Sequence, residues 1–131
     1  MKKTTLLNTA LSETISMMGH YDMLVIGDAG LPMPPGPRRI DLALTRGVPG
    51  FMDTLRAVLS ELQVQSIIVA SEIVERSPEI LQGIQALLPG VPVEYVPHEE
   101  FKARTAGSVA MVRTGEFTPY ANVILVAGVV F

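Results

Sequence analysis

The chain has 131 residues, enough for one domain around a single hydrophobic core, and we expect residues 1–131 to form that domain. Its formal net charge of −3 argues against binding of nucleic acid, which requires lysine and arginine clustered on one face. The absence of cysteine excludes disulfides and thiolate sites, and no apolar segment has the length of a membrane span.

Hydrophobic residues make up 48% of the chain and charged residues only 18%. A small protein has a large surface for its volume, so these proportions predict that some apolar surface faces another subunit. The lysines at the N-terminus resemble the start of a signal peptide, but Asn8, Ser12 and Glu13 interrupt the apolar core that such a peptide needs. We therefore expect a cytoplasmic protein.

The first elements in the chain are predicted to be a helix and a strand that leads into a loop. Apolar residues recur at helical spacing over residues 7–18, and Gly19 then supplies a residue that commonly ends helices in a left-handed conformation. The short apolar run at 23–27 predicts a strand. The segment 29–37 is so rich in proline and glycine that it predicts a rigid loop.

The middle of the chain continues this alternation. A short strand is expected near residues 40–42, followed by an amphipathic helix whose buried stripe includes Leu55 and Leu62. The run at 66–70 predicts a buried strand. The next helix is predicted to start with Ser77 as its N-cap and to stop before a Pro-Gly pair at 89–90.

The last third is predicted to contain three strands and one short helix. The strands are expected at 91–96, 108–113 and 122–130, the last of them fully buried, and the helix at 98–104. Strands that alternate with helices indicate an α/β fold, a three-layer sandwich with a parallel or mixed central sheet.

Polar residues follow several of the predicted strands. In open α/β sheets the ligand crevice lies beyond the carboxyl ends of the strands, so the candidates for a site are Asp28, Glu72, His98 and Arg113. A carboxylate, an imidazole and a guanidinium at one rim suit a small polar ligand.

Two further pairs of residues can address one ligand together. His98 and Lys102 are four residues apart and share a face if their segment is helical. Tyr120 and Asn122 are two apart in an extended stretch and therefore point to the same side.

Each candidate also has a purely structural interpretation. Asp28 can be a turn former or a helix cap, and His20 can interact with the terminal carbonyls of the helix before it. His98, which two glutamates follow, is typical of a solvated helix start, and Lys102 is typical of surface charge.

Glu72, Arg113 and Glu116 have structural interpretations as well. Glu72 can cap a helix or pair with Arg76 on the same short turn, and Arg113 is expected to form an ion pair with Glu116.

Several chemistries are excluded by the motifs that the sequence does not contain. There is no dinucleotide or nucleotide phosphate-binding motif, no serine in a nucleophile elbow, and no histidine spacing typical of a metal site. We therefore expect neither a cofactor nor a metal.

Five stretches in order carry a resemblance to a known family: "LLNTAL", "GHYDMLVIGDAGLPMPPG", "IDLAL", "PHEEFK" and "RTGEFTPYANVILVAGVVF". Together they resemble the RbsD/FucU sugar-mutarotase family, on its ribose-specific branch, from the first helix to the last residue. Gly27 stands where the resemblance leads us to expect alanine, a change that concerns packing only.

The resemblance implies an isomerase that interconverts the pyranose and furanose forms of free D-ribose. It assigns His20 as the acid/base, and it places Asp28, His98, Lys102, Tyr120 and Asn122 on sugar-contacting positions. Whether Asp28 orients the imidazole or only binds the sugar stays open. The alternatives are an L-fucose-type mutarotase and a non-catalytic sugar-binding protein of ribose uptake.

The resemblance further implies a ring-shaped homo-oligomer, typically a decamer, with sites between neighbouring subunits. In that arrangement the apolar C-terminal segment would be buried where subunits meet. The chemistry that it implies needs no cofactor, because opening a hemiacetal breaks no bond between carbon and hydrogen and requires only proton transfer between oxygens.

Overall fold

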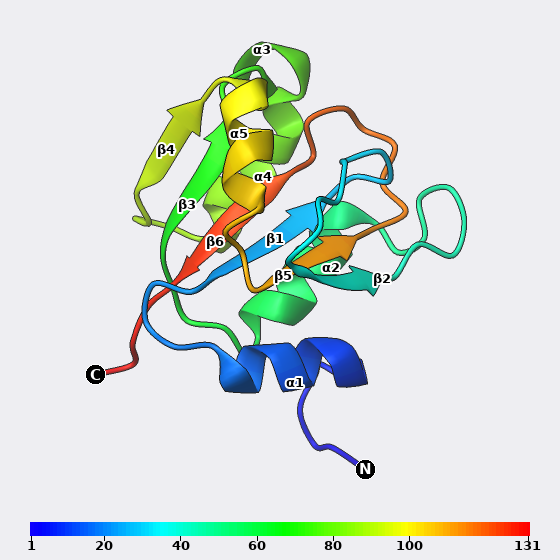
Figure 1. Cartoon of the computed structure of the whole chain (residues 1–131), viewed down its shortest axis with the longest axis vertical. Coiled ribbons are helices and arrows are strands. Elements are labelled where there is room, and N and C mark those ends of the chain that lie inside the picture. Colours follow the sequence, from blue (N-terminus) through cyan, green and yellow to red (C-terminus); the bar gives the residue numbers. More distant parts are fainter.

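A six-stranded mixed sheet runs through the middle of the computed structural model, which describes residues 1–131 (Figure 1). In spatial order the strands are β2 (Arg38–Asp41), β5 (Ala110–Arg113), β1 (Met23–Gly27), β6 (Val123–Ala127), β3 (Val64–Ala70) and β4 (Val93–Val96). Only β6 is antiparallel to its neighbours, β1 and β3. Five strands therefore end at one edge of the sheet, and β6 begins at that same edge.

Helices cover both faces of the sheet. One face packs against α1 (Thr9–Met17), α2 (Phe51–Leu59) and α4 (Pro78–Leu87), and the other against α5 (His98–Thr105). Figure 1 shows α5 in front of the sheet and α2 and α4 behind it. The predicted three-layer α/β sandwich with a mixed sheet is confirmed.

Alternating strand residues explain why both faces are apolar. In β1, Leu24 and Ile26 belong to the larger core on the side of α2, whereas Val25 packs in the smaller core with Phe101 of α5. Leu31 extends the smaller core from the loop after β1, so the proline-rich segment covers part of the face that α5 leaves open.

The first helix is shorter than predicted at both ends. Asn8 caps it, because its side-chain oxygen accepts a hydrogen bond from the backbone N–H of Leu11 at 3.0 Å. The helix ends at Met17, and Met18 is already extended. The expected left-handed residue is not Gly19 but Tyr21, whose φ is 71°.

Ser77 does not cap the helix that it precedes. Its hydroxyl donates to the carbonyl of Pro119 at 2.6 Å instead, which ties the start of α4 to the segment before β6. A four-residue helix that the sequence did not predict, α3 (Ile73–Arg76), connects β3 to this point.

The final strand is shorter than the predicted 122–130. It ends at Ala127, which pairs with Val64 at the beginning of β3, so beyond it no strand remains to pair with. Val130 and Phe131 are 85% and 102% exposed, so this end of the chain is not buried within the subunit.

Candidate functional site

A pocket of about 280 Å³ opens at the edge where five strands end and β6 begins. Its lining comes from the ends of β1 and α3, the start of α5 and the segment before β6, namely Asp28, Gly30, Leu31, Pro32, Arg76, His98, Pro119, Tyr120 and Asn122. Of the four polar residues that the sequence places beyond the strand ends, Asp28 and His98 line this pocket, and Glu72 and Arg113 do not.

Asp28 and Asn122 form a reciprocal pair at the centre of this edge. The backbone N–H of Asp28 donates to Oδ1 of Asn122 at 2.8 Å, and Nδ2 of Asn122 donates to Oδ2 of Asp28 at 3.0 Å. They meet because antiparallel β6 starts where β1 ends. Gly27 leaves room for the amide, since a Cβ there would lie 2.6 Å from the Leu31 side chain and 3.0 Å from Oδ1 of Asn122.

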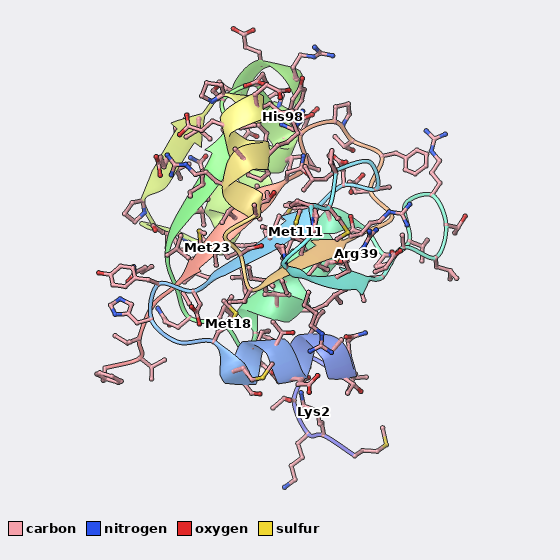
Figure 2. The ribbon with its side chains drawn as sticks, in the orientation of Figure 1. Lys2, Met18, Met23, Arg39, His98 and Met111 are labelled. Atoms are coloured by element: carbon pink, nitrogen blue, oxygen red, sulfur yellow. The ribbon has the colours of Figure 1, made fainter.

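His98 stands at the first position of α5, at the upper end of the molecule in Figure 2. Its backbone N–H donates to both carboxylate oxygens of Glu72, at 3.2 and 3.0 Å. Its imidazole meets the ring of Tyr120 edge-on, with centroids 5.2 Å apart. Nδ1 is buried and makes no hydrogen bond within the chain.

Of its two predicted roles, Glu72 takes that of a cap: it holds the start of α5 and forms no ion pair with Arg76. Burial alone would raise the pKa of Glu72. Hydrogen bonds from the Ser71 hydroxyl and from the backbone N–H groups of Glu72 and His98 outweigh burial and lower that pKa below its ordinary value of 4.5.

Tyr120 adopts a left-handed backbone conformation with φ of 61°. In a residue other than glycine this conformation costs about 1 to 3 kcal/mol and persists where the surrounding structure imposes it. Such strain is concentrated at functional sites, which agrees with the position of Tyr120 in the pocket wall.

Glu116 supports the loop that carries Tyr120. Its carboxylate accepts hydrogen bonds from the backbone N–H of Phe51, the first residue of α2, at 3.1 Å, and from the Thr118 hydroxyl at 2.9 Å. Burial would raise the pKa of Glu116, but these bonds and the backbone N–H groups of Phe117 and Thr118 lower it. The role of Glu116 is thus to fix the loop.

The predicted ion pair between Arg113 and Glu116 is absent. Arg113 instead lies 3.1 Å from a carboxylate oxygen of Asp41 and donates to the carbonyl of Ala29 at 3.0 Å. The reason is the sheet order, because β5 lies between β2 and β1 and its last residue reaches the ends of both neighbours.

Two of the residues that the family resemblance assigns to the site lie outside the pocket of the single chain. Lys102 is one turn beyond His98, but its ammonium pairs with Glu99 at 2.7 Å and does not line the cavity. His20 lies before β1, with Nε2 2.7 Å from Oε1 of Gln65 and its ring stacked on Tyr21. The predicted contact between its imidazole and the end of α1 is not made.

The distance between His20 and the pocket follows from the length of β1. Five strand residues at about 3.3 Å each separate the two ends by roughly 16 Å. In Figure 2, Met18, two residues before His20, lies toward the lower end of the view, whereas His98 lies near the top. A single chain therefore does not bring the His20 imidazole to the pocket.

Arg76 is a pocket residue that the sequence did not reveal as one. Its guanidinium lies 5.9 Å from the ring centroid of Tyr120. The only signal was its position in the segment after a predicted strand. A second cavity of about 410 Å³ adjoins the first and shares Asp28, Gly30 and Pro119 with it.

The model of the RbsD / FucU transport protein family matches residues 1–130. The chain belongs to this family. A D-ribose pyranase of Chloroflexus aggregans is 60% identical over 131 residues, with both chains covered completely. The solved structure of Bacillus subtilis RbsD complexed with D-ribose matches this one with a TM-score of 0.96. The two sequences are 46% identical, and the match covers both chains completely.

A more distant solved structure is that of a mutarotase for another sugar. The fucose mutarotase of Streptococcus pneumoniae, solved in complex with L-fucose, is 25% identical. The match covers 95% of this chain and 94% of that one, with a TM-score of 0.78. No helix of the structure has the length and apolar character needed to cross a membrane.

Proposed function

We propose that this protein is a D-ribose pyranase, which interconverts the six-membered and five-membered ring forms of free D-ribose. The observation that carries the proposal is the pocket of about 280 Å³, whose lining includes the Asp28 carboxylate, the buried Asn122 amide that orients it, and His98. The full-length similarity to proteins named D-ribose pyranase supports this choice of sugar.

The pocket side chains divide the task of holding hydroxyl groups. The Asp28 carboxylate accepts from them, while Asn122 keeps that carboxylate oriented and His98 offers the free Nδ1. Tyr120 supplies a phenol that donates and accepts. Lys102 reaches the sugar by leaving its ion pair with Glu99, at little cost because exposed pairs contribute only about 0 to 1 kcal/mol.

The reaction needs one group that moves protons. Ring opening removes the proton of the anomeric hydroxyl, forms the carbonyl and delivers a proton to the departing ring oxygen, and a different hydroxyl then closes on the carbonyl. We assign this proton transfer to His20, because imidazole both takes and gives protons near neutral pH. Such a group typically contributes about 100- to 10,000-fold to the rate.

The assignment of His20 requires a second copy of the chain. Its imidazole and the pocket lie at opposite ends of β1, so His20 of one copy reaches the pocket of the next in a head-to-tail contact. Such contacts form a ring where the rotation between neighbouring copies closes. The exposed Tyr21, Val130 and Phe131 supply apolar surface for that contact. We infer a homo-oligomer, with the decamer as the preferred assembly, that acts in the cytoplasm between sugar uptake and phosphorylation.

Exchange between ring forms tests the proposal directly. Saturation-transfer NMR on equilibrated D-ribose should show magnetisation passing between pyranose and furanose signals when the wild-type protein is added. In His20→Ala the catalysed rate should fall by about 100- to 10,000-fold while the thermal melt and sugar binding are kept. Glu79→Ala, an exposed change on α4, is the matched control and should keep the wild-type rate.

The same experiment separates the alternatives. A panel that includes L-fucose identifies a fucose-type mutarotase by faster exchange of that sugar. Binding of D-ribose without exchange would assign the protein as a sugar carrier or sensor. An unchanged exchange rate in His20→Ala would reject His20 as the acid/base.

A further inference from the structure

We propose that Arg76 donates a hydrogen bond to a sugar hydroxyl at the mouth of the pocket and contributes to the choice of sugar. This inference rests on the proposed function, since it names a further residue that contacts the same ligand. It concerns binding, so it can be tested separately from catalysis.

The fold brings Arg76 to the pocket through a short detour of the chain. After β3, the four-residue helix α3 turns back toward the pocket and places Arg76 at its last position. The guanidinium lies 5.9 Å from the centroid of the Tyr120 ring, within the range of a cation–π contact. The ring thereby restrains a long side chain that would otherwise be free, which lowers the entropy lost when a ligand binds.

The guanidinium has its hydrogen-bonding capacity available. Four other arginines pair with carboxylates, namely Arg38, Arg56, Arg104 and Arg113. Arg76 has neither an ion pair nor a hydrogen bond within the chain, although a guanidinium carries five N–H donors. Its exposed side chain is therefore free to donate into the pocket.

The pocket as a whole matches the chemistry of a sugar. The ionised Asp28 only accepts hydrogen bonds and Arg76 only donates them, and both line the same cavity. A hydroxyl group both donates and accepts. A ring that carries several hydroxyls can therefore satisfy the two residues at once, whereas a purely anionic ligand would be repelled by the carboxylate.

A comparison of sugars with variants tests the contact. We expect Arg76→Ala to weaken D-ribose binding roughly tenfold, measured by NMR titration, because a hydrogen bond from a charged donor is lost. Arg76→Lys keeps the positive charge but lacks the planar guanidinium group, so it should lose less affinity for D-ribose than Arg76→Ala. Four derivatives of the pyranose ring, each lacking the hydroxyl at C1, C2, C3 or C4, are then titrated in parallel. For the derivative that lacks the contacted hydroxyl, wild type and Arg76→Ala should bind equally.

The matched control is Arg46→Ala. Arg46 stacks on Phe117 at 5.1 Å in a similar way but does not line this pocket, so its removal should leave the affinity unchanged. In exchange kinetics, Arg76→Ala should raise KM and leave kcat close to wild type, as expected when a uniform binding contact is lost.

Two outcomes would overturn the proposal. If Arg76→Ala and Arg76→Lys both bind D-ribose as wild type does, Arg76 makes no contact. If Arg76→Ala weakens all four deoxy sugars as much as ribose, it acts on the shape of the pocket and not on one hydroxyl. Wild-type protein that binds ribose without exchanging its rings would refute the proposed enzyme activity and leave the Arg76 comparison fully readable.

Discussion

The backbone of His98, at the start of α5, is held in place by a carboxylate from another element. Glu72 follows β3, and because β3 and β4 are parallel neighbours, the residues after them meet at the same edge of the sheet. A carboxylate that accepts from the first N–H of a helix is also favoured by the positive end of the helix dipole. Glu72 is thus a positioning residue that lies outside the pocket lining.

Replacing Glu72 by glutamine tests this role through pH. The folded pKa of Glu72 lies below 4.5, so its stabilisation is present above the unfolded pKa and is lost as pH falls through the folded pKa. We expect thermal melts to show that the free energy of unfolding of Glu72→Gln is about 1 kcal/mol lower than that of wild type at pH 7. The two values should become equal as the pH is lowered to 3. Ribose affinity should fall roughly three- to tenfold.

The control for this measurement is Glu75→Gln on the same short helix. The Glu75 side chain is exposed and makes no hydrogen bond, so both readouts should match wild type. If the difference in free energy of unfolding between Glu72→Gln and wild type stayed constant down to pH 3, the negative charge of Glu72 would not be the cause of the stabilisation.

At the scale of elements, the site depends on how closely two loops approach each other. The segment between β5 and β6 carries Glu116 and Tyr120. It packs against the loop that follows β2, and the two backbones are in direct contact. A Cβ at Gly115 would lie 2.5 Å from the Thr45 carbonyl oxygen and 2.6 Å from that of Val48. Only glycine allows this approach, because the atoms that a Cβ would meet belong to the backbone and cannot move aside as a flexible side chain can.

We therefore expect Gly115→Ala to push the two loops apart and to weaken the site together with the fold. The cost should be about 1 to 3 kcal/mol in free energy of unfolding, measured by urea denaturation, with a loss of ribose affinity because Tyr120 lies on the displaced segment. In Gly107→Ala the nearest contact would be an ordinary 3.4 Å to Met23, so this control should be close to neutral. Equal stability of the two variants would refute the close approach.

At the scale of the whole molecule, the proposed site is divided between two ends of the sheet. His20 precedes β1 and Asp28 follows it, so no small side-chain movement within one chain brings them together. If neighbouring copies complete each other's sites, each active site takes its pocket from one copy and its imidazole from another.

Mixed oligomers provide the test. His20→Ala and Asp28→Ala should each be inactive alone, but after joint dissociation and reassembly roughly a quarter of the sites should combine both intact residues. Recovery of ring-exchange activity, measured by NMR, is the expected result. As a control, reassembly of His20→Ala with the double variant His20→Ala/Asp28→Ala should recover no activity. If the mixture of His20→Ala with Asp28→Ala were as inactive as each variant alone, shared sites would be excluded.

Much of the fold and part of the site could be predicted because they depend on local patterns. The buried strand at 23–27 and the helix that starts at His98 were confirmed, since burial repeats along a strand or a helix within a few residues. Of the four residues expected at the ends of strands, Asp28 and His98 line the pocket, whereas Glu72 and Arg113 bind neighbouring segments instead.

The amino-acid sequence by itself determined the segments that form strands and helices, apart from the four-residue helix α3, and which polar groups stand at their ends. Only the tertiary structure decided that Arg113 meets Asp41, that Arg76 reaches Tyr120, and that Lys102 and His20 stay outside the pocket of one chain. The physical reason is that these contacts join residues distant in the chain. They depend on the order and direction of the strands and on the conformation of the turns, which the preferences of neighbouring residues do not encode.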